Sequence, residues 1–373
     1  MKDENQGKQA PKDGPQAPSR LRRHLRNWLI LSVLALVLPA GGRWWLSSYA
    51  SFVPGKSFAV PMIVYIPAGT GFAGIKQTLV EHEVIRDDPR FYLLAKSMGV
   101  VGKMQAGEYL FPPALSHREI IEKLAKGDVY YRPLTIPEGF NILQVGNLLA
   151  ADFGFDANLF LRQVRDRKFI KTLGLEAPSL EGYLYPDTYF VTRGQGLEAV
   201  ISMMVLRFQR VASEIVRQYQ PDTSSGGQAL SLHEIVILAS IVEKETAVAA
   251  ERPLVAAVYL NRLKKSMRLQ ADPTVIYGIS GFSGNLTRQD LLTPSPYNTY
   301  EKNGLPAGPI ANPGRESLAA VVHPAEVDYL YFVAKNDGTH HFSSSLPEHN
   351  RAVSRFQKQE NVSGNEAGLG KNQ

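Results

Sequence analysis

Two glutamates that follow an apolar stretch, Glu243 and Glu245, are the residues of this sequence best suited to chemistry. A carboxyl group at the end of a buried apolar helix is partly removed from water, which favours its neutral form. A glutamic acid that keeps its proton near neutral pH can donate that proton to the oxygen of a glycosidic bond as the bond breaks. The pair therefore suggests general acid catalysis on a sugar chain.

Helical spacing separates the roles of the two glutamates. Ser231 and Glu234 form a capping box, and the apolar run at 235–242 predicts a buried helix behind it. Glu245 falls on the core face, about 200° around the axis from Glu243, so the two cannot act as a local pair. Glu243 is therefore the expected acid. It shares its face with small side chains that leave room for a sugar ring, namely Ala239, Ser240, Thr246 and Ala247.

A structural role is the alternative, in which the glutamates only pair with Lys244, Arg252 or Arg262. Other chemistry has weaker support. His340 and His341 are adjacent in an expected strand and point to opposite faces, and no H-E-x-x-H pattern is present. The chain has no cysteine, no phosphate-binding G-x-x-x-x-G-K-[ST] and no G-x-S-x-G. We expect no metal and no cofactor.

The net charge of +6 is concentrated at the N-terminus. Residues 1–46 hold eight Lys or Arg and three acidic residues, which gives +5 and leaves +1 for the rest of the chain. This distribution does not support nucleic-acid binding.

An N-terminal membrane helix is expected at 27–46, after a basic stretch that contains Arg22, Arg23 and Arg26. The positive-inside tendency places a disordered tail, 1–26, in the cytoplasm and the later residues across the membrane. A cleaved signal peptide is the alternative, because Leu38-Pro39-Ala40 loosely resembles a cleavage site.

The exported part reads as α+β. Ile66-Pro67-Ala68-Gly69 and Ile136-Pro137-Glu138-Gly139 each predict a short strand and a turn before an amphipathic helix. A strand at Gly107–Phe111 and a helix at His117–Lys126 complete a small αβ module, assigned to 58–135. Such a module either binds cell-wall sugars or is a rigid spacer.

A mixed α+β domain is assigned to 136–358, and 359–373 to a disordered tail. Residues from about 155 to 220 are expected to be helical around a loop at 180–189, with a hinge at 220–228. Further expected elements are a helix from Pro253 to Leu263, a loop from Thr293 to Gly314, a hairpin turn at Asn336-Asp337-Gly338 and a final helix from Ser343 to Phe356.

Several ordered blocks resemble the endolytic murein transglycosylases, the YceG-like or MltG family. Leu238-Ala239-Ser240-Ile241-Val242-Glu243-Lys244-Glu245-Thr246 is similar to their catalytic helix. The resemblance extends from the membrane segment to about residue 358. The other blocks are Leu180-Glu181-Gly182-Tyr183-Leu184-Tyr185-Pro186-Asp187-Thr188-Tyr189, Tyr259-Leu260-Asn261-Arg262-Leu263, Met267-Arg268-Leu269-Gln270-Ala271-Asp272-Pro273-Thr274, Ser295-Pro296-Tyr297-Asn298-Thr299-Tyr300 and Gly304-Leu305-Pro306-Ala307-Gly308-Pro309-Ile310-Ala311-Asn312-Pro313-Gly314.

The resemblance implies a lyase of the bacterial inner membrane with a periplasmic catalytic domain. Such an enzyme cuts the MurNAc–GlcNAc bond inside nascent peptidoglycan strands, leaves 1,6-anhydro-MurNAc ends and terminates polymerisation beside the peptidoglycan synthases. It also implies that 58–135 is LysM-like and that Glu243 is the catalytic residue. A lysozyme-type hydrolase and a non-catalytic peptidoglycan-binding scaffold are the alternatives. Residues expected to hold sugar, or else to brace the loops, are Glu181, Tyr183, Gln270, Tyr297, Asn298 and Asn312.

Overall fold

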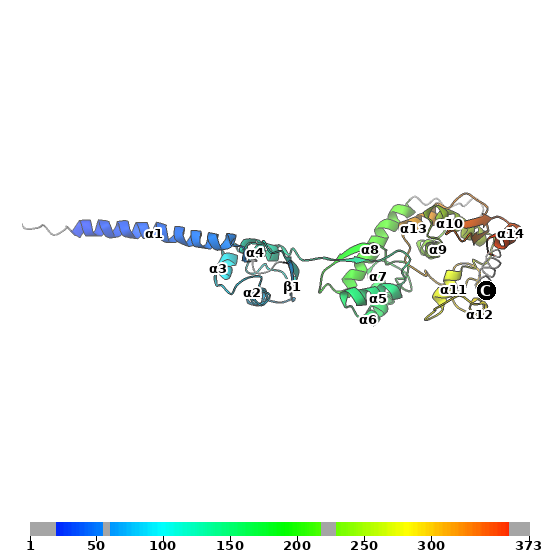
Figure 1. The fold of residues 1–373 in the computed structure, drawn as a ribbon, viewed down its shortest axis with the longest axis horizontal. Coiled ribbons are helices and arrows are strands. Elements are labelled where there is room, and N and C mark those ends of the chain that lie inside the picture. Colours follow the sequence, from blue (N-terminus) through cyan, green and yellow to red (C-terminus); the bar gives the residue numbers. More distant parts are fainter. Residues whose placement is uncertain (1–19, 55–59, 218–228, 358–373) are drawn as a thin grey trace, which may run out of the picture. The chain divides into compact units, whose positions relative to one another are not determined.

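The computed structural model describes residues 20–54, 60–217 and 229–357 (Figure 1). The chain forms two compact units, unit 1 up to Tyr130 and unit 2 from Tyr131. The predicted hinge at 220–228, the tail at 359–373 and most of the N-terminal tail lie outside the described residues.

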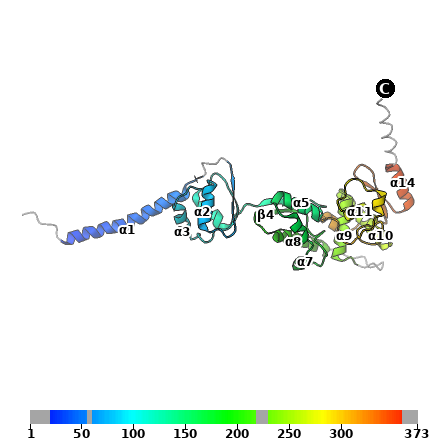
Figure 2. The same cartoon turned by 90° about the horizontal axis from the view of Figure 1, so that it is seen from below.

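Unit 1 begins with one long helix, α1 (Arg20–Ser51), of which Arg23–Ser51 is long and apolar enough to cross a membrane. The helix continues through Pro39 without a break (Figure 2). The last turn belongs to the module that follows, because Tyr49 and Ala50 are buried in its core. An anchor and a signal sequence both fit a helix of this kind near the N-terminus.

The module of unit 1 is a two-stranded antiparallel sheet with helices between and after its strands. The sheet pairs β1 with β2, and Val64, Ile66, Tyr109 and Phe111 are fully buried against the helices. The helix α3 was not predicted. The elements are β1 (Met62–Ile66), α2 (Phe72–Glu81), α3 (Arg90–Ser97), β2 (Gly107–Phe111) and α4 (His117–Lys126).

Unit 2 is mixed α+β with two small antiparallel sheets among many helices (Figure 1). One sheet pairs β3 with β4, and the other pairs β5 with β6. Its elements are β3 (Arg132–Thr135), α5 (Ile142–Phe153), α6 (Ala157–Gln163), α7 (Arg167–Thr172), β4 (Thr188–Val191), α8 (Leu197–Val216), α9 (Leu232–Glu245), η2 (Ala249–Glu251), α10 (Arg252–Lys264), α11 (Asp272–Gly278), α12 (Arg288–Leu291), α13 (Arg315–Val322), β5 (Tyr331–Ala334), β6 (His340–Ser343) and α14 (Leu346–Phe356).

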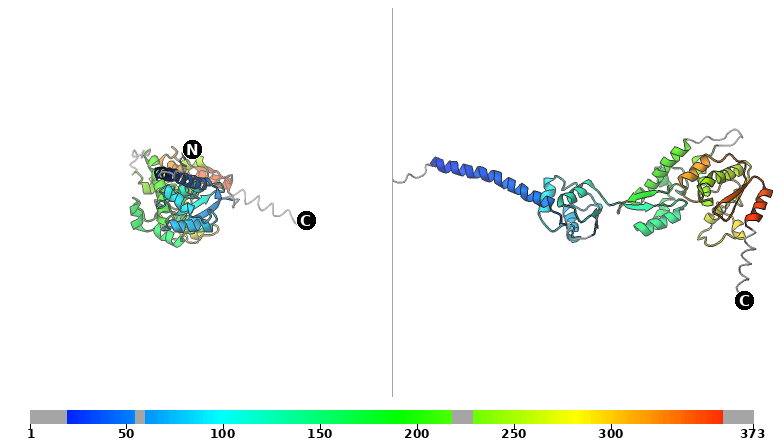
Figure 3. Two further views of the ribbon diagram at one scale, coloured as in Figure 1. Left: turned by 90° about the vertical axis from the view of Figure 1, so that its left-hand side faces the viewer. Right: turned by 45° about the horizontal axis from the view of Figure 1, so that its top comes forward.

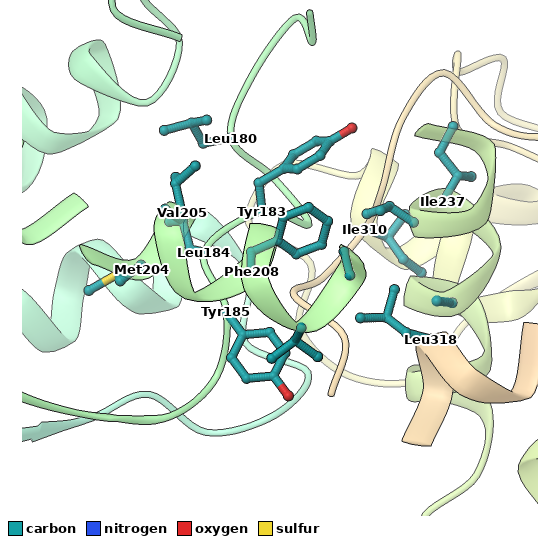
Figure 4. Packing of buried hydrophobic residues seen from close by; sticks show 14 of the residues in the cluster. Leu180, Tyr183, Leu184, Tyr185, Met204, Val205, Phe208, Ile237, Ile310 and Leu318 are labelled. Carbon is teal, nitrogen blue, oxygen red and sulfur yellow. The ribbon is translucent and has the colours of Figure 1, made fainter. Parts of the chain in front are cut away.

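One continuous hydrophobic core joins the early and late halves of unit 2. Tyr183 and Phe208 make an edge-on ring contact with centroids 5.0 Å apart. They lie between Leu180 and Met204 on one side and Leu318 on the other (Figure 4). The loop at 180–189 and the helix α8 are therefore parts of the core that supports α9 and α13.

The structure confirms the capping box of α9, the hairpin turn at 336–338 and the helix that begins near Pro253. The hairpin of β5 and β6 packs on α14 and touches α10 (Figure 3, right). The expectation of a helical region with one loop at 155–220 was wrong in one respect, since residues 188–191 form β4. This strand is four residues long and exists through its pairing with β3, which local sequence does not reveal.

Candidate active site

The helix α9 carries Glu243 to the edge of the buried core. The Ser231 hydroxyl accepts a hydrogen bond from Glu234 N, while the Glu234 carboxylate accepts one from Ser231 N, so both ends of the capping box are made. Every residue from Ile235 to Val242 is buried. The all-round apolar pattern thus places the helix inside the core, with the polar residues at its C-terminal end.

The helix ends at Glu245, which corrects one sequence-based expectation. Thr246 is extended (φ −140°), so neither it nor Ala247 shares a helical face with Glu243. The Thr246 hydroxyl accepts from Val248 N and donates to the Glu251 carboxylate, and these bonds turn the chain away. On the remaining face, Ser240 is fully buried and its hydroxyl accepts from Ile310 N at 3.0 Å. The space predicted for a sugar beside Ser240 is therefore filled by the segment around residue 310.

The Glu243 carboxylate is held at the N-terminus of α13. Its Oε2 accepts from Gly314 N at 3.0 Å and from the Ser317 hydroxyl at 2.8 Å. Its Oε1 lies 3.5 Å from Nη2 of Arg252. The side chain is 6 % exposed. The end of a helix is a favourable place for a negative charge, because its first backbone N–H groups lack partners within the helix.

These contacts differ from the expectation of a neutral acid in an apolar pocket. All three groups that contact the carboxylate are polar: a backbone N–H, a hydroxyl and a guanidinium. Of the three cations proposed as structural partners, Arg252 is the one that pairs with Glu243. Arg262 instead donates to the carbonyl oxygens of Leu330 and Leu269, both at 2.7 Å.

Sequence reasoning missed a second carboxyl group at this site. Glu138 Oε2 lies 3.8 Å from Nη2 of Arg252, the same nitrogen that contacts Glu243. The Glu138 side chain is 49 % exposed. Burial raises the pKa of Glu138, the charge of Glu243 raises it further, and Arg252 opposes both. A sequence signal was available, because Glu138 stands where the otherwise similar turn at 66–69 has Ala68.

The neighbouring Glu245 is structural in its contacts. Its Oε1 accepts from the Tyr259 hydroxyl at 2.6 Å. Burial raises the pKa of Glu245 to about 7, against the hydrogen bond from Tyr259, which lowers it. The motif at 259–263 makes internal hydrogen bonds through three of its side chains, those of Tyr259, Asn261 and Arg262. Asn261 donates to the carbonyls of Val327 and Tyr329.

Of the six residues expected to hold sugar or brace loops, Glu181 and Asn312 join segments that are distant in sequence. The Glu181 carboxylate accepts from Ile142 N at the start of α5 and from the Tyr277 hydroxyl of α11. Burial raises the pKa of Glu181 to about 7. The Asn312 side chain accepts from Leu184 N and donates to the Phe140 carbonyl.

Tyr183 and Asn298 also have internal partners. The Tyr183 hydroxyl lies 2.6 Å from Nδ1 of His233. Asn298 is fully buried, donates to the carbonyls of Leu291 and Thr293 and accepts from Tyr300 N. The contacts of these two residues favour the bracing alternative.

Gln270 and Tyr297 are the more accessible members of the set. Gln270 is exposed and has a left-handed backbone (φ +49°), with its N–H bound to the Thr299 carbonyl. Tyr297 is half-buried, and its ring meets that of Tyr277 edge-on at 4.8 Å.

His340 has an acidic partner within unit 2. Nδ1 of His340 lies 2.6 Å from the Glu251 carboxylate, and His340 N also donates to it. Among residues 20–54, 60–217 and 229–357, no group of three or more His, Asp or Glu side chains could hold a metal ion.

Comparison with known proteins identifies the family. The sequence model of the YceG-like family matches residues 64–355. An endolytic murein transglycosylase of Bacillus subtilis (strain 168) is 33 % identical over 330 residues, which are 82 % of this chain and 90 % of that protein. An endolytic murein transglycosylase of Streptococcus pneumoniae (serotype 2, strain D39) is 28 % identical over 88 % of this chain, and the match spans 65 % of that longer protein.

A solved structure agrees with these matches. The crystal structure of a putative yceG-like protein from Listeria monocytogenes is 33 % identical, with a TM-score of 0.54, over 79 % of this chain and 99 % of that chain. The family match covers about half of unit 1 and nearly all of unit 2, including Glu138, Glu243 and Arg252. The chain therefore belongs to the YceG-like family.

Proposed function

We propose that the chain is an endolytic peptidoglycan lytic transglycosylase in which Glu243 is the catalytic acid and base. The strongest support is that the two carboxylate oxygens of Glu243 are bound unequally. Oε2 is fixed by two short hydrogen bonds, from Gly314 N and the Ser317 hydroxyl. Oε1 has only the longer contact to Arg252, at 3.5 Å. Oε1 is thus the oxygen able to leave its partner and face a substrate.

The reaction follows from one carboxyl group. Protonated Glu243 donates its proton to the bridging oxygen as the bond from C1 of MurNAc to that oxygen breaks, and the GlcNAc unit leaves with a free 4-hydroxyl group. The Glu243 carboxylate then takes the proton of the MurNAc C6 hydroxyl while O6 bonds to C1. The 1,6-anhydro ring closes and Glu243 is protonated again, so no second carboxylate is needed to activate water.

Glu243 would take up its proton from solvent as the substrate binds. A sugar bound over a side chain that is already 6 % exposed removes its remaining water, and such desolvation disfavours the charged form. Gln270 and Tyr297 are our candidates for sugar contact, since they are the accessible members of the predicted set. Glu181, Tyr183, Asn298 and Asn312 would instead hold the loops that position α9 and α13.

The location follows from the same assignment. We propose that α1 is an uncleaved single-pass anchor in the inner membrane, with the N-terminus cytoplasmic and both units periplasmic, where nascent glycan strands lie. The burial of Tyr49 and Ala50 in the core of unit 1 supports an anchor that is retained. The βααβ order of unit 1 is compatible with a LysM-like glycan-binding module. Termination of strand growth beside the synthases would follow from this placement. The intact mass of the membrane-extracted protein tests the anchor.

The decisive experiment is product analysis with Glu243→Gln. Purified full-length protein in detergent should convert uncrosslinked glycan strands to fragments with 1,6-anhydro ends, identified by mass spectrometry. Glu243→Gln should lower this rate by about 10²- to 10⁴-fold, the usual contribution of a general acid. Glu245→Gln is the matched control, because Gln keeps an acceptor for Tyr259, and it should stay within a few-fold of wild type.

Other outcomes separate the alternatives. Reducing muramic ends from wild-type protein would identify a hydrolase. Bound but uncut glycan would identify a scaffold, in which the Arg252–Glu243 pair is purely structural.

A further inference from the structure

Glu138 and Glu243 share one guanidinium nitrogen. Nη2 of Arg252 lies 3.5 Å from Glu243 and 3.8 Å from Glu138. Neither distance is that of a tight two-pronged pair, and the buried Nε of Arg252 has no hydrogen-bond partner among the described residues. The guanidinium is therefore held loosely between two carboxylates and fixed by neither.

The end of the loop before α13 touches both carboxyl groups. Gly314 donates its N–H to Glu243. A Cβ atom at Gly314 would overlap Oε1 of Glu138, so the Glu138 carboxyl group lies directly against this backbone. The turn that carries Glu138 is tied to the same loop, because Gly139 N donates to the Asn312 carbonyl at 3.0 Å and Asn312 N to the Phe140 carbonyl at 2.8 Å. The position of Glu138 beside Glu243 is thus set by backbone bonds.

Around Glu138 and Glu243, carboxylates outnumber the cations. Arg252 is the cation between them, and Lys244 of α9 turns its Nζ to the Gly139 carbonyl, at 3.4 Å. On the other sides lie Glu316 of α13, whose charge also acts on Glu138, and Tyr185 of the 180–189 loop, on which Glu138 acts in turn. Two carboxylates that compete for one guanidinium cannot both be fully neutralised by it.

We propose that Glu138 is a positioning residue for the catalytic acid, an inference that rests on the proposed function. By sharing Arg252, Glu138 prevents that guanidinium from holding Glu243 in its charged form. With Glu138 present, Arg252 is divided between two carboxylates and Glu243 can take up a proton when a sugar covers it. Without the charge of Glu138, Arg252 pairs with Glu243 alone and the proton is harder to keep. Glu138 acts through Arg252 and needs no contact with the substrate.

The test is the pH profile of kcat for anhydro-end formation by the full-length protein, because kcat reports the protonation of the enzyme–substrate complex. The alkaline limb is the part of the profile in which activity falls as the pH rises. In Glu138→Gln this limb should move to lower pH by on the order of half a unit, which is the effect of one charge at a distance of several ångströms in a partly solvated site. At a pH above the limb, this shift is a loss of about threefold. Glu138→Asp keeps the charge and should leave the limb near its wild-type position.

Two further variants control for folding and for charge in general. Glu138→Ala is the second charge-removing variant, because Ala68 occupies the matching position of the similar turn in unit 1, and it should shift the limb as Glu138→Gln does. Glu316→Gln removes the same charge from α13 and should give a smaller shift. In an Arg252→Gln background, Glu138→Gln should add less than half of the shift it causes alone.

Failure of the proposed role of Glu138 can be distinguished from failure of the proposed function. If Glu138→Gln and Glu138→Ala lower the rate equally at every pH, or change nothing, Glu138 is not a positioning residue, and the proposed function still stands. If wild-type protein forms no anhydro ends, or Glu243→Gln forms them at the wild-type rate, the proposed function fails whatever Glu138 does.

Discussion

The two similar turns of the chain show how one local structure serves two purposes. In both, the proline carbonyl accepts from the N–H three residues on, with Thr70 N to Pro67 at 3.3 Å and Phe140 N to Pro137 at 3.4 Å. In both, the glycine is left-handed, at φ +81° for Gly69 and +73° for Gly139. The local sequence thus produces the same strand, turn and helix twice.

Their surroundings differ completely. A Cβ on Gly69 would meet nothing within 4 Å, whereas one on Gly139 would meet Glu243 and Lys244 at 3.6 Å. The second turn also replaces Ala68 with Glu138 and is bound to the loop before α13. The turn is therefore a scaffold, and one substitution and one tertiary contact make it part of a candidate active site.

The first prediction compares Gly314→Ala with Gly71→Ala. Both glycines precede a helix with nearly the same backbone, at φ −75°, a conformation that alanine adopts readily. A Cβ on Gly71 meets nothing, whereas one on Gly314 overlaps the Glu138 carboxyl group. Because the Glu138 carboxyl group ends a flexible, half-exposed side chain, it should turn away from the added methyl group. Gly314→Ala should then lower activity about threefold at a pH above the alkaline limb, as Glu138→Gln does, and Gly71→Ala should not change it. Equal activity of the two variants would remove Gly314 from the site.

The second prediction contrasts the pH dependence of stability in the two units. In unit 2, burial raises the pKa of both Glu181 and Glu245 to about 7, above the 4.5 of the free side chain. Their stabilising contribution is present below pH 4.5 and is lost as the pH rises to about 7, at a cost of roughly 2 kcal/mol or more. In unit 1, burial lowers the pKa of His117, so stability is instead lost as the pH falls through 6.5.

Hydrogen exchange resolved by peptide measures both units in the same full-length sample. Between pH 5 and 8, protection corrected for intrinsic exchange should fall in unit 2 and rise in unit 1. Glu181→Gln should weaken the trend in unit 2, where Glu245 still contributes, and leave unit 1 unchanged. Parallel trends in the two units would contradict this explanation.

The third prediction concerns the two left-handed glycines. Gly69→Ala and Gly139→Ala should each destabilise their own unit by about 1 kcal/mol, because a Cβ is strained at positive φ. Only Gly139→Ala should also lower activity, by about tenfold, since it shifts the turn against Glu243. Thermal unfolding and kcat/KM of both variants test this. A loss of activity in Gly69→Ala would show that the turns are not independent.

Much of the fold could be read from local signals. The capping box at Ser231 and Glu234 and the turn at 336–338 are formed by residues close in sequence, so their patterns are sufficient. The helix end at Glu245 was mispredicted because the bonds of Thr246 to Val248 and Glu251 turn the chain, which helical spacing does not show. The strand β4 was mispredicted because its partner, β3, lies far along the chain. The same reason explains why Glu138 was missed: it lies 105 residues before Glu243, and only Arg252 and the loop at Gly314 bring the two together.

Contiguous residues encode the buried helix that carries Glu243, the apolar N-terminal helix and the family motifs, so the sequence was sufficient to predict all three. Only the tertiary structure decided what surrounds that glutamate: the first turn of α13, a shared arginine and a second carboxyl group. Hydrogen bonds and charge pairs act over a few ångströms of space. Residues that are far apart in the chain therefore acquire a common chemistry only once the fold places them side by side.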